Sequence, residues 1–245
     1  MRALLSFFTA LPVRNGSPEA AAGWAYLLPL VGLVTGAPGA ALILLGYAMP
    51  PGVISTLALA AVLLAAGLHH TDGVLDVGDA LMVRGTPEQR REILKDTRVG
   101  VGGIGALFVV YAPTLAALVA LANDSPVRAA LALLAGEVSA HSAMLLILAS
   151  GKPSEPTSSS IPFVRALKGP RSLIGVPLAL LAPLPFLLPL DVLAPLAALS
   201  APLTSLVALL VARRTFGGIG GDLVGATGEL SRAGLLIYLS AVIQS

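Results

Sequence analysis

Three aspartates in the first third of the chain stand at a spacing that favours metal chemistry. Asp72, Asp76 and Asp79 are four and three residues apart, so a helix would carry all three on one face. Carboxylates crowded on one stripe repel one another unless a cation lies between them, and Mg²⁺ prefers such oxygen ligands. The alternative is a solvated polar face paired with arginines. His70, two residues before Asp72, is a candidate base or hydrogen-bond donor.

A charged segment follows these aspartates. Thr86 and Gln89 predict a capping box at the start of a helix over 86–98. Much of its charge is typical of a self-neutralising surface helix held by pairs of acidic and basic side chains. Its end is different, because Lys95, Asp96 and Arg98 precede the glycine-rich run VGVGG directly. Backbone amides beside Lys and Arg suit phosphate oxygens.

A second cluster lies at residues 213–232, RRTFGGIGGDLVGATGELSR. It is not a Walker A loop, because no Gly-Lys-Ser/Thr ends it. Asp222 and Glu229 are seven residues apart, so they face the same way if a helix begins near Asp222. Gly225 between them would leave a patch free of side chains that a ligand can approach closely. The alternative is a loop followed by tight helix packing.

Two ionisable residues lie within a long apolar segment. Glu137 and His141 are four residues apart, and ionisable groups inside a membrane are functional candidates by default. The alternative is that they pair with each other. Gly32 and Gly36 in another apolar segment predict close helix packing in lipid.

The composition places these motifs in a membrane protein. The 245 residues are 56% hydrophobic and 11% charged, whereas soluble domains carry about 25% charged residues. Residues 20–68 and 99–123 contain no Asp, Glu, Lys or Arg, while residues 69–100 hold six acids and five bases. An ordinary soluble domain, a disordered chain and a nucleic-acid-binding module are excluded by this pattern. The absence of cysteine excludes disulfides and thiolate metal sites.

The long apolar segments predict an all-α, polytopic membrane bundle of about six to seven transmembrane helices in a single domain, residues 1–245. A bilayer core about 30 Å thick needs about 20 apolar residues in helical form. The candidate spans are roughly 25–49, 53–68, 104–122, 129–150, 173–190, 192–212 and 233–245. The proline-rich fifth and sixth are either kinked spans or a re-entrant pair. Residues 3–13 are too short to span and fit the membrane interface.

The distribution of Lys and Arg predicts an orientation. With a cytoplasmic N-terminus and seven spans, the inside segments 1–24, 69–103, 151–172 and 213–232 hold 14 of the 15 Lys and Arg residues, a positive-inside pattern. We therefore expect a multi-pass protein of the plasma membrane, surrounded by the lipid bilayer, with its charged segments on the cytoplasmic face. The Pro/Ser-rich stretch 151–160 is predicted to be a flexible loop.

These motifs together resemble the cobalamin synthase family of membrane-embedded adenosylcobinamide-GDP ribazoletransferases. Three segments carry the resemblance: LSFFTALPV at 5–13, GLHHTDGVLDVGDA through LKDTRVGVGG at 67–103, and RRTFGGIGGDLVGATGEL at 213–230. They meet the family patterns His-x-Asp-Gly-x-x-Asp-x-x-Asp, Lys/Arg-Asp-x-Arg-x-Gly and Gly-Gly-x-x-Gly-Asp-x-x-Gly-Ala-x-x-Glu. The resemblance covers the chain effectively end to end. A departure is Ser139-Ala140-His141, where bacterial members often carry an Arg.

The resemblance implies a transferase of cobalamin biosynthesis. Such enzymes join adenosylcobinamide-GDP to α-ribazole or its 5′-phosphate, giving adenosylcobalamin or its phosphate and GMP. The reaction is a Mg²⁺-dependent phosphoryl-group transfer, in which a ribose hydroxyl attacks the phosphate bonded to the corrinoid side arm. The resemblance leaves open which ribazole form is used and whether the protein is a homo-oligomer.

The same resemblance assigns roles to individual residues. The expected Mg²⁺ ligands are Asp72, Asp76 and Asp79, with Asp222 or Glu229. Lys95 and Arg98 are expected to contact the diphosphate, and His70 or Asp96 to act as the base. The remaining expected substrate-binding residues are Arg84, Gly100, Gly217, Gly218, Gly221 and Gly225.

Other classes fit the motifs less well. A CDP-alcohol transferase needs Asp-Gly-x-x-Ala-Arg, and here Leu75 is followed by Asp76-Val77. Prenyltransferases usually carry two Asp-rich clusters, whereas the second cluster here has only Asp222 and Glu229. A transporter would need its polar groups near the membrane midplane, and nearly all of these lie in segments predicted on one face.

Overall fold

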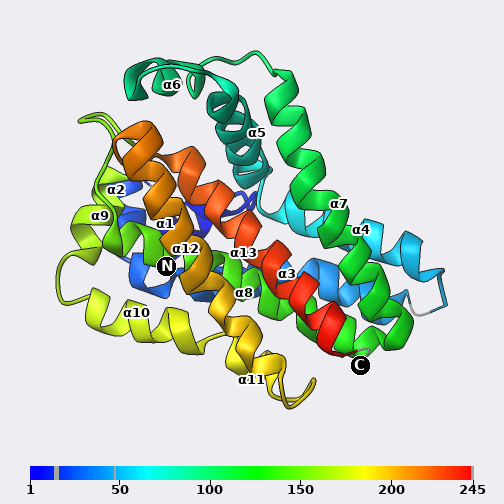
Figure 1. Ribbon diagram of the computed structural model, residues 1–245. Helices are drawn as coiled ribbons and strands as arrows, with labels where there is room; N and C mark the ends of the chain where they lie inside the picture. Colours follow the sequence, from blue (N-terminus) through cyan, green and yellow to red (C-terminus); the bar gives the residue numbers. More distant parts are fainter. Residues whose placement is uncertain (14–16, 47, 244–245) are drawn as a thin grey trace.

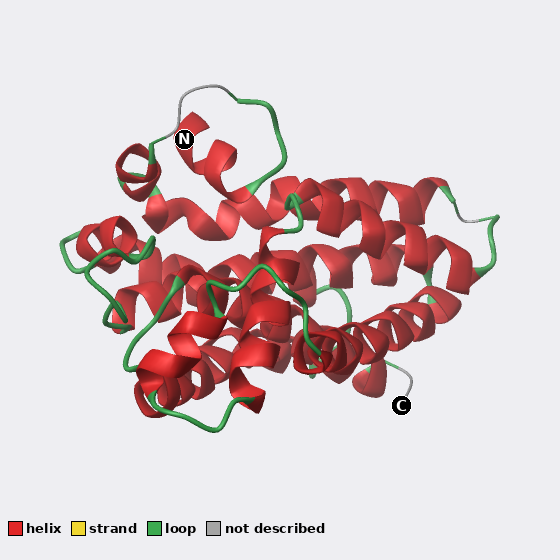
Figure 2. Cartoon of the chain, turned by 90° about the horizontal axis from the view of Figure 1, so that it is seen from above, coloured by secondary structure: helices red, strands yellow, loops and turns green. Residues whose placement is uncertain are grey.

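The protein is built from α-helices, as the sequence predicts. The computed structural model describes residues 1–13, 17–46 and 48–243, and within these ranges it contains no β-strand beyond an isolated bridge (Figure 2). The N-terminal half contains α1 (Arg2–Phe8), α2 (Pro18–Ala22), η1 (Ala25–Leu27), α3 (Leu28–Leu45), α4 (Pro51–Ala65), α5 (His69–Met82), α6 (Pro87–Ile93) and α7 (Val101–Asp124). The C-terminal half contains α8 (Pro126–Ser150), α9 (Ile161–Leu167), α10 (Ser172–Leu181), α11 (Leu184–Leu187), η2 (Ala194–Leu199), α12 (Ser200–Val211), η3 (Ala212–Phe216) and α13 (Gly221–Val242).

Several of these helices are suited to crossing a membrane. Among the described residues, four helical segments are long and apolar enough: Ala25–Leu45, α7, α8 and Ala194–Phe216. The count rises to six if α4 with α5, and α9 with the helical stretch after it, each form one bent span. The all-α polytopic class is therefore confirmed, and the four to six candidate spans reach the predicted six to seven only if both bent pairs are counted as spans.

One predicted boundary is wrong. Residues 233–242 of the predicted span 233–245 are the second half of α13, which begins at Gly221, and residues 244–245 lie outside the described residues. Residues 221–232 belong to a segment predicted to be cytoplasmic, and in the structure they form the first half of this helix and are mostly buried. The reason is that one helix carries both a polar half and an apolar half, and hydropathy alone detects only the second.

A sharp bend separates α4 from α5. The two helices meet at 91°, and α4 has 15 residues, which is short for a span. Gly67 and Leu68 at the bend have φ values of +72° and +62°. The left-handed conformation costs a non-glycine residue about 1–2 kcal/mol, so the surrounding packing must hold Leu68 in place. The bend directs α5 between α7 and α13 (Figure 1).

Helix α8 forms the centre of the bundle. In its most apolar stretch 89% of the residues are buried, compared with 28% in α7. Helix α3 approaches it closely at Gly32, where a Cβ atom would lie 2.7 Å from the Cα atom of Val138. Gly36 also packs on α8, against the side chain of Glu137. The predicted close packing at these two glycines is confirmed.

Candidate active site

The aspartate stripe lies on a helix, as predicted, and α5 carries it against the start of α13. Asp72 is exposed, and Asp76 is half-buried. Gly73 faces the backbone of Asp222, so closely that a Cβ atom there would lie 3.0 Å from the Cα atom of Asp222. A glycine at this position therefore lets the two helices approach and brings Asp222 within electrostatic range of Asp72 and Asp76. We call Asp72, Asp76 and Asp222 the acid cluster.

The carboxylates of the acid cluster repel one another. Asp76 interacts electrostatically with Asp72 and Asp222, and Asp222 interacts with Asp72. Across the described part of the chain, no side chain forms a hydrogen bond or an ion pair with any of the three carboxylates. As placed, no three His, Asp or Glu side chains of the described residues converge closely enough to hold a metal ion. The cluster is thus a set of uncompensated negative charges.

Asp79, the third predicted ligand on α5, is engaged with the start of α7. Its Oδ2 accepts a hydrogen bond from the backbone N–H of Gly100 at 2.7 Å, and its Oδ1 accepts one from Gly103 at 2.8 Å. The carboxylate therefore caps the N-terminus of α7, where backbone N–H groups are unpaired and the helix dipole favours negative charge. The backbone N–H of Gly100 is thus already bonded to Asp79, but the residue also lines a cavity, and its expected role in substrate binding stays a prediction.

Helix α6 begins as predicted but ends early. Thr86 and Gln89 form the capping box, with the Thr86 N–H donating to Gln89 Oε1 at 2.9 Å. The helix ends at Ile93 instead of continuing to 98. Lys95 therefore lies in the connection to α7. Arg84, before α6, is exposed and lines none of the cavities described below.

Two cations beside the acid cluster share one carboxylate. Lys95 Nζ donates to Glu155 Oε2 at 2.8 Å, and Arg91 Nε donates to Glu155 Oε1 at 3.0 Å. Arg91 also donates to the carbonyl oxygen of Phe216 at 2.7 Å. These partners, Lys95 first, hold the pKa of Glu155 below its usual value. The 151–160 stretch is a loop, but the prediction that it is flexible is not supported, because Ser154 also donates its backbone N–H to Ile219.

Asp96 and Arg98 form an exposed pair. Arg98 donates its side-chain and backbone N–H groups to Asp96, with the shortest contact, Nη2 to Oδ2, at 2.7 Å. These hydrogen bonds lower the pKa of Asp96 to about 2. A carboxylate with so low a pKa is a poor proton acceptor near neutral pH. The structure therefore disfavours Asp96 as the base and leaves His70 as the candidate.

His70 lies between the acid cluster and the bundle core. It is buried, its Nδ1 lies 4.0 Å from Glu229 Oε1, and its ring lies 5.7 Å from that of His141. Gly225 packs against its backbone, with a Cβ atom expected 3.1 Å from His70 Cα. The role of Gly225 in helix packing is thus the one that the structure supports, although the residue also lines a cavity.

Glu229 does not join the acid cluster. It lies two turns further along α13, buried, in an ion pair with Arg232. Arg232 also donates from Nη1 to Glu137 Oε1 at 2.7 Å, and Thr35 donates to Glu137 Oε2 at 2.7 Å. We call Glu137, Glu229 and Arg232 the buried ionic cluster. Glu137 and His141 are joined only by a hydrogen bond between the His141 ring and the Glu137 backbone.

Two cavities meet at Asp222 of the acid cluster. The aromatic cavity, of about 440 Å³, is lined by Phe7, Phe8 and Phe163 on one side and by His70, Asp72 and Asp222 on another. The small cavity, of about 200 Å³, contains Arg91, Lys95 and Glu155. Ser159, Gly221 and Asp222 line both. Cations and uncompensated carboxylates therefore face adjoining spaces.

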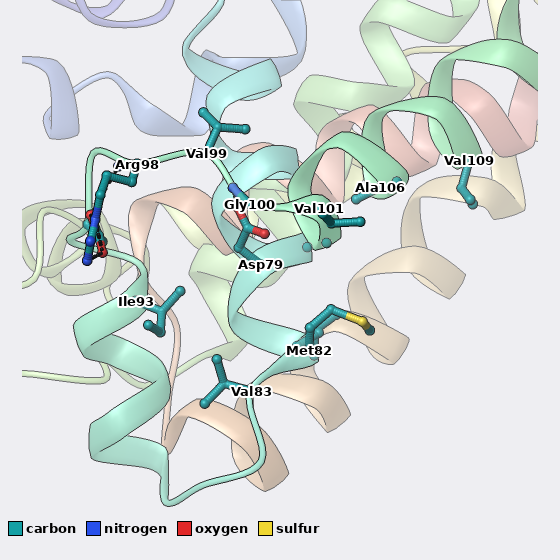
Figure 3. Close-up of a pocket in the computed structure, with 15 residues that line it drawn as sticks. Asp79, Met82, Val83, Ile93, Arg98, Val99, Gly100, Val101, Ala106 and Val109 are labelled. Atoms are coloured by element: carbon teal, nitrogen blue, oxygen red, sulfur yellow. Dashed lines mark hydrogen bonds and ion pairs between the residues drawn. The ribbon is translucent and has the colours of Figure 1, made fainter.

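A third, large cavity of about 950 Å³ lies at the other end of the aspartate stripe (Figure 3). Its walls are largely apolar and include Met82, Ile93 and Val101. Asp79 points toward Gly100 at one wall, and Arg98 lies at the rim. The stripe on α5 thus runs between two cavities large enough for small molecules.

The glycines that precede α13 serve different purposes. Gly217 has a φ of +74°, which ends η3 and favours glycine. Gly218 is buried against the backbone of Lys152 and Ser154. Gly221 is exposed and lines two cavities. Among the glycines predicted to bind substrate, its position fits that role best.

Three residues of these clusters and cavities are not predicted from the sequence. Glu155 lies in a Pro/Ser-rich stretch, and no periodic pattern there identifies it as a candidate. Arg91 belongs to the charged stripe of α6, and only its contact with Phe216, far along the chain, distinguishes it. Arg232 was counted among the cytoplasmic cations, although it is 1% exposed. Its spacing of three residues from Glu229 was the available signal.

Comparisons with known proteins agree on one family. Residues 1–240 match the family described as cobalamin-5-phosphate synthase. A relative from Methanocella arvoryzae is 34% identical over 99% of this chain and 96% of its own length. One from Pyrobaculum islandicum is 36% identical over 99% and 94%, and one from Halorubrum lacusprofundi is 36% identical over 96% and 94%. All three are named adenosylcobinamide-GDP ribazoletransferase. No solved structure matches the chain.

Proposed function

Because the chain belongs to the cobalamin-5-phosphate synthase family, we propose that it is an adenosylcobinamide-GDP ribazoletransferase. It joins adenosylcobinamide-GDP to α-ribazole or α-ribazole 5′-phosphate. The products are adenosylcobalamin or its 5′-phosphate, and GMP. The reaction completes the nucleotide loop of cobalamin.

One observation carries this proposal from the structure itself. The uncompensated acid cluster lies beside Arg91 and Lys95, and its Asp222 lines two adjoining cavities. A third cavity lies at the other end of α5. A transfer between two substrates needs space for both, and a diphosphate needs cations. The alternative for the aspartate stripe is a solvated polar face paired with arginines. It is disfavoured because, among the described residues, no arginine pairs with Asp72, Asp76 or Asp222.

The acid cluster fits Mg²⁺ by its chemistry. Asp72, Asp76 and Asp222 offer hard oxygen donors without partners, whereas the carboxylates of Asp79 and Glu229 are already engaged. Mg²⁺ is commonly bound by one or two carboxylates together with waters and substrate phosphates. A complete set of converging protein ligands is therefore not required before substrate binds. When bound, Mg²⁺ would neutralise charge on the diphosphate.

The residues of the chain perform the remaining steps. Lys95 binds diphosphate oxygens, with Arg98 contributing from the rim of the large cavity. A ribose hydroxyl oxygen of the acceptor forms a bond to the phosphorus that carries the corrinoid side arm. The bond from that phosphorus to the oxygen of the second phosphate breaks, and GMP leaves with that oxygen. His70 accepts the hydroxyl proton at Nε2, since its Nδ1 faces Glu229.

The proposal includes an orientation in the cell. The chain would lie in the plasma membrane, with α6 and the 151–160 loop on the cytoplasmic face, where water-soluble phosphorylated substrates are available. The clustering of Lys and Arg in these segments supports this orientation.

A direct assay tests the function. Purified protein in detergent is incubated with adenosylcobinamide-GDP, α-ribazole and Mg²⁺, and GMP and the corrinoid product are measured. We expect both products in equal amounts, and loss of both when EDTA replaces Mg²⁺. Uptake of a corrinoid into vesicles without any GMP release would contradict the proposal and favour a transporter.

A further inference from the structure

The N-terminal helix α1 has no role in the mechanism above, yet it forms one wall of the aromatic cavity. Phe7 and Phe8 extend from α1, and Phe163 extends from α9, more than 150 residues later in the chain. The ring centroids of Phe7 and Phe163 lie 5.0 Å apart, and those of Phe8 and Phe163 lie 5.6 Å apart. The His70 ring continues this group at 6.3 Å from Phe8. Two distant segments thus build one aromatic wall.

The lining of this cavity divides by chemistry. Helices α1, α8 and α9 contribute rings and the apolar side chains of Met144 and Leu148, with Ser6 as the polar residue on this side. Helix α5, the loop before α9 and the start of α13 contribute His69, Asp72, Ser159 and Asp222. A flat apolar ring fits the first side, because aromatic pairs prefer offset or edge-to-face contact at these spacings. Hydroxyl groups fit the second side, next to the acid cluster.

We propose that the aromatic cavity binds the acceptor substrate, a ribonucleoside with an apolar aromatic base. The base packs against Phe7, Phe8 and Phe163, and the ribose points toward Asp72 and Asp222. This inference rests on the proposed function, because it assigns one of the two substrates of that reaction to a place. The cavity volume of about 440 Å³ suits a molecule of nucleoside size.

The guanosine of the donor fits this cavity poorly. A guanine base carries several hydrogen-bonding groups on its edges, and burying them without partners is costly. The described residues that line the cavity include no Asn, Gln, Lys or Arg, and its carboxylates lie on the side of the acid cluster. An apolar base such as a benzimidazole leaves fewer groups unpaired. The cavity therefore selects for the acceptor.

Substitution of the aromatic wall tests the assignment. Phe7→Leu removes a half-buried ring, and Phe163→Leu removes a buried one. Phe186→Leu is the matched control, because Phe186 is half-buried but packs in the other core cluster, away from the cavity. Binding of α-ribazole without donor is measured by equilibrium dialysis, and the KM values of both substrates are measured from GMP release.

We expect Phe7→Leu and Phe163→Leu each to weaken α-ribazole binding about tenfold, the loss typical of removing one aromatic contact to a base. The KM of adenosylcobinamide-GDP should stay within about twofold in these variants, and Phe186→Leu should change neither value. A rise confined to the KM of the donor would overturn the assignment and place guanosine in the cavity. Unchanged binding of both substrates would overturn it in favour of lipid or structural packing.

The same experiment separates this inference from the proposed function. If the wild-type protein binds α-ribazole in dialysis and Phe7→Leu weakens this binding as expected, the cavity assignment is supported even if no GMP is released. GMP release with unchanged acceptor binding in both Phe variants supports the function and contradicts the assignment.

Discussion

The acid cluster and the buried ionic cluster each take a carboxylate from α13, Asp222 in the first case and Glu229 in the second, yet the surroundings of these two carboxylates differ. Asp222 lies in the first turn of the helix beside two cavities and has no cationic partner among the described residues. Glu229, two turns later, is 1% exposed and contacts Arg232 and Tyr111. A carboxylate that is already paired stabilises helix contacts, whereas an unpaired one at a cavity is available to a ligand. The spacing of the acids alone does not distinguish these roles.

This comparison predicts that charge removal acts on activity in one cluster and on stability in the other. The largest effect on activity is expected for Asp76→Asn. A metal site supplies several kcal/mol of transition-state stabilisation, so the rate of GMP release should fall about 100-fold or more. Removal of one charge from a repelling group should leave stability equal or slightly higher. Near-normal activity would remove Asp76 from the metal site.

The largest effect on stability is expected for Arg232→Met. This change leaves Glu137 and Glu229 buried without a positive charge, and breaking a buried ion pair on one side typically costs about 3–5 kcal/mol of the free energy of unfolding. Denaturation in detergent micelles measures the loss. A triple variant with Glu137→Gln and Glu229→Gln should recover part of it. If the denaturation midpoint of Arg232→Met equals that of the wild type, the buried ionic cluster does not hold α8 and α13 together.

A smaller effect on stability is expected for Asp79→Asn. The asparagine keeps one acceptor for the α7 backbone but loses the charge and the second acceptor, so stability should fall by about 1–2 kcal/mol. Transfer by the folded fraction should stay close to the wild-type rate. A loss of activity as large as that of Asp76→Asn, with stability unchanged, would instead make Asp79 a metal ligand.

Local patterns in the sequence are sufficient to predict part of the fold and part of the site. The helical class, the stripe on α5 and the capping box at Thr86 follow from periodicity and from hydrogen bonds between residues three or four apart. The family motifs added the roles. These features depend on neighbours in the chain, so one sequence contains the necessary information.

Contacts between distant segments were not predictable in the same way. Asp79 caps a helix that begins 22 residues later, and Glu155 joins two cations that lie 60 and 64 residues before it. Arg232 lies in the polar half of α13, which hydropathy does not identify as part of a span, and it is buried against Glu137 of α8 and Tyr111 of α7. Only tertiary packing decides whether such a charge is paired, and the pairing in turn decides its role.

The central claim is that the acid cluster, and not the buried ionic cluster, carries the chemistry. A titration of GMP release against Mg²⁺ concentration in Asp222→Asn and Glu229→Gln, at equal amounts of folded protein, tests it most directly. We predict that Asp222→Asn requires at least about tenfold more Mg²⁺ or loses transfer altogether, because it lacks one of the hard oxygen donors. Glu229→Gln should keep the wild-type Mg²⁺ dependence. The reverse result, with Glu229→Gln shifting the Mg²⁺ dependence and Asp222→Asn leaving it unchanged, would contradict the account.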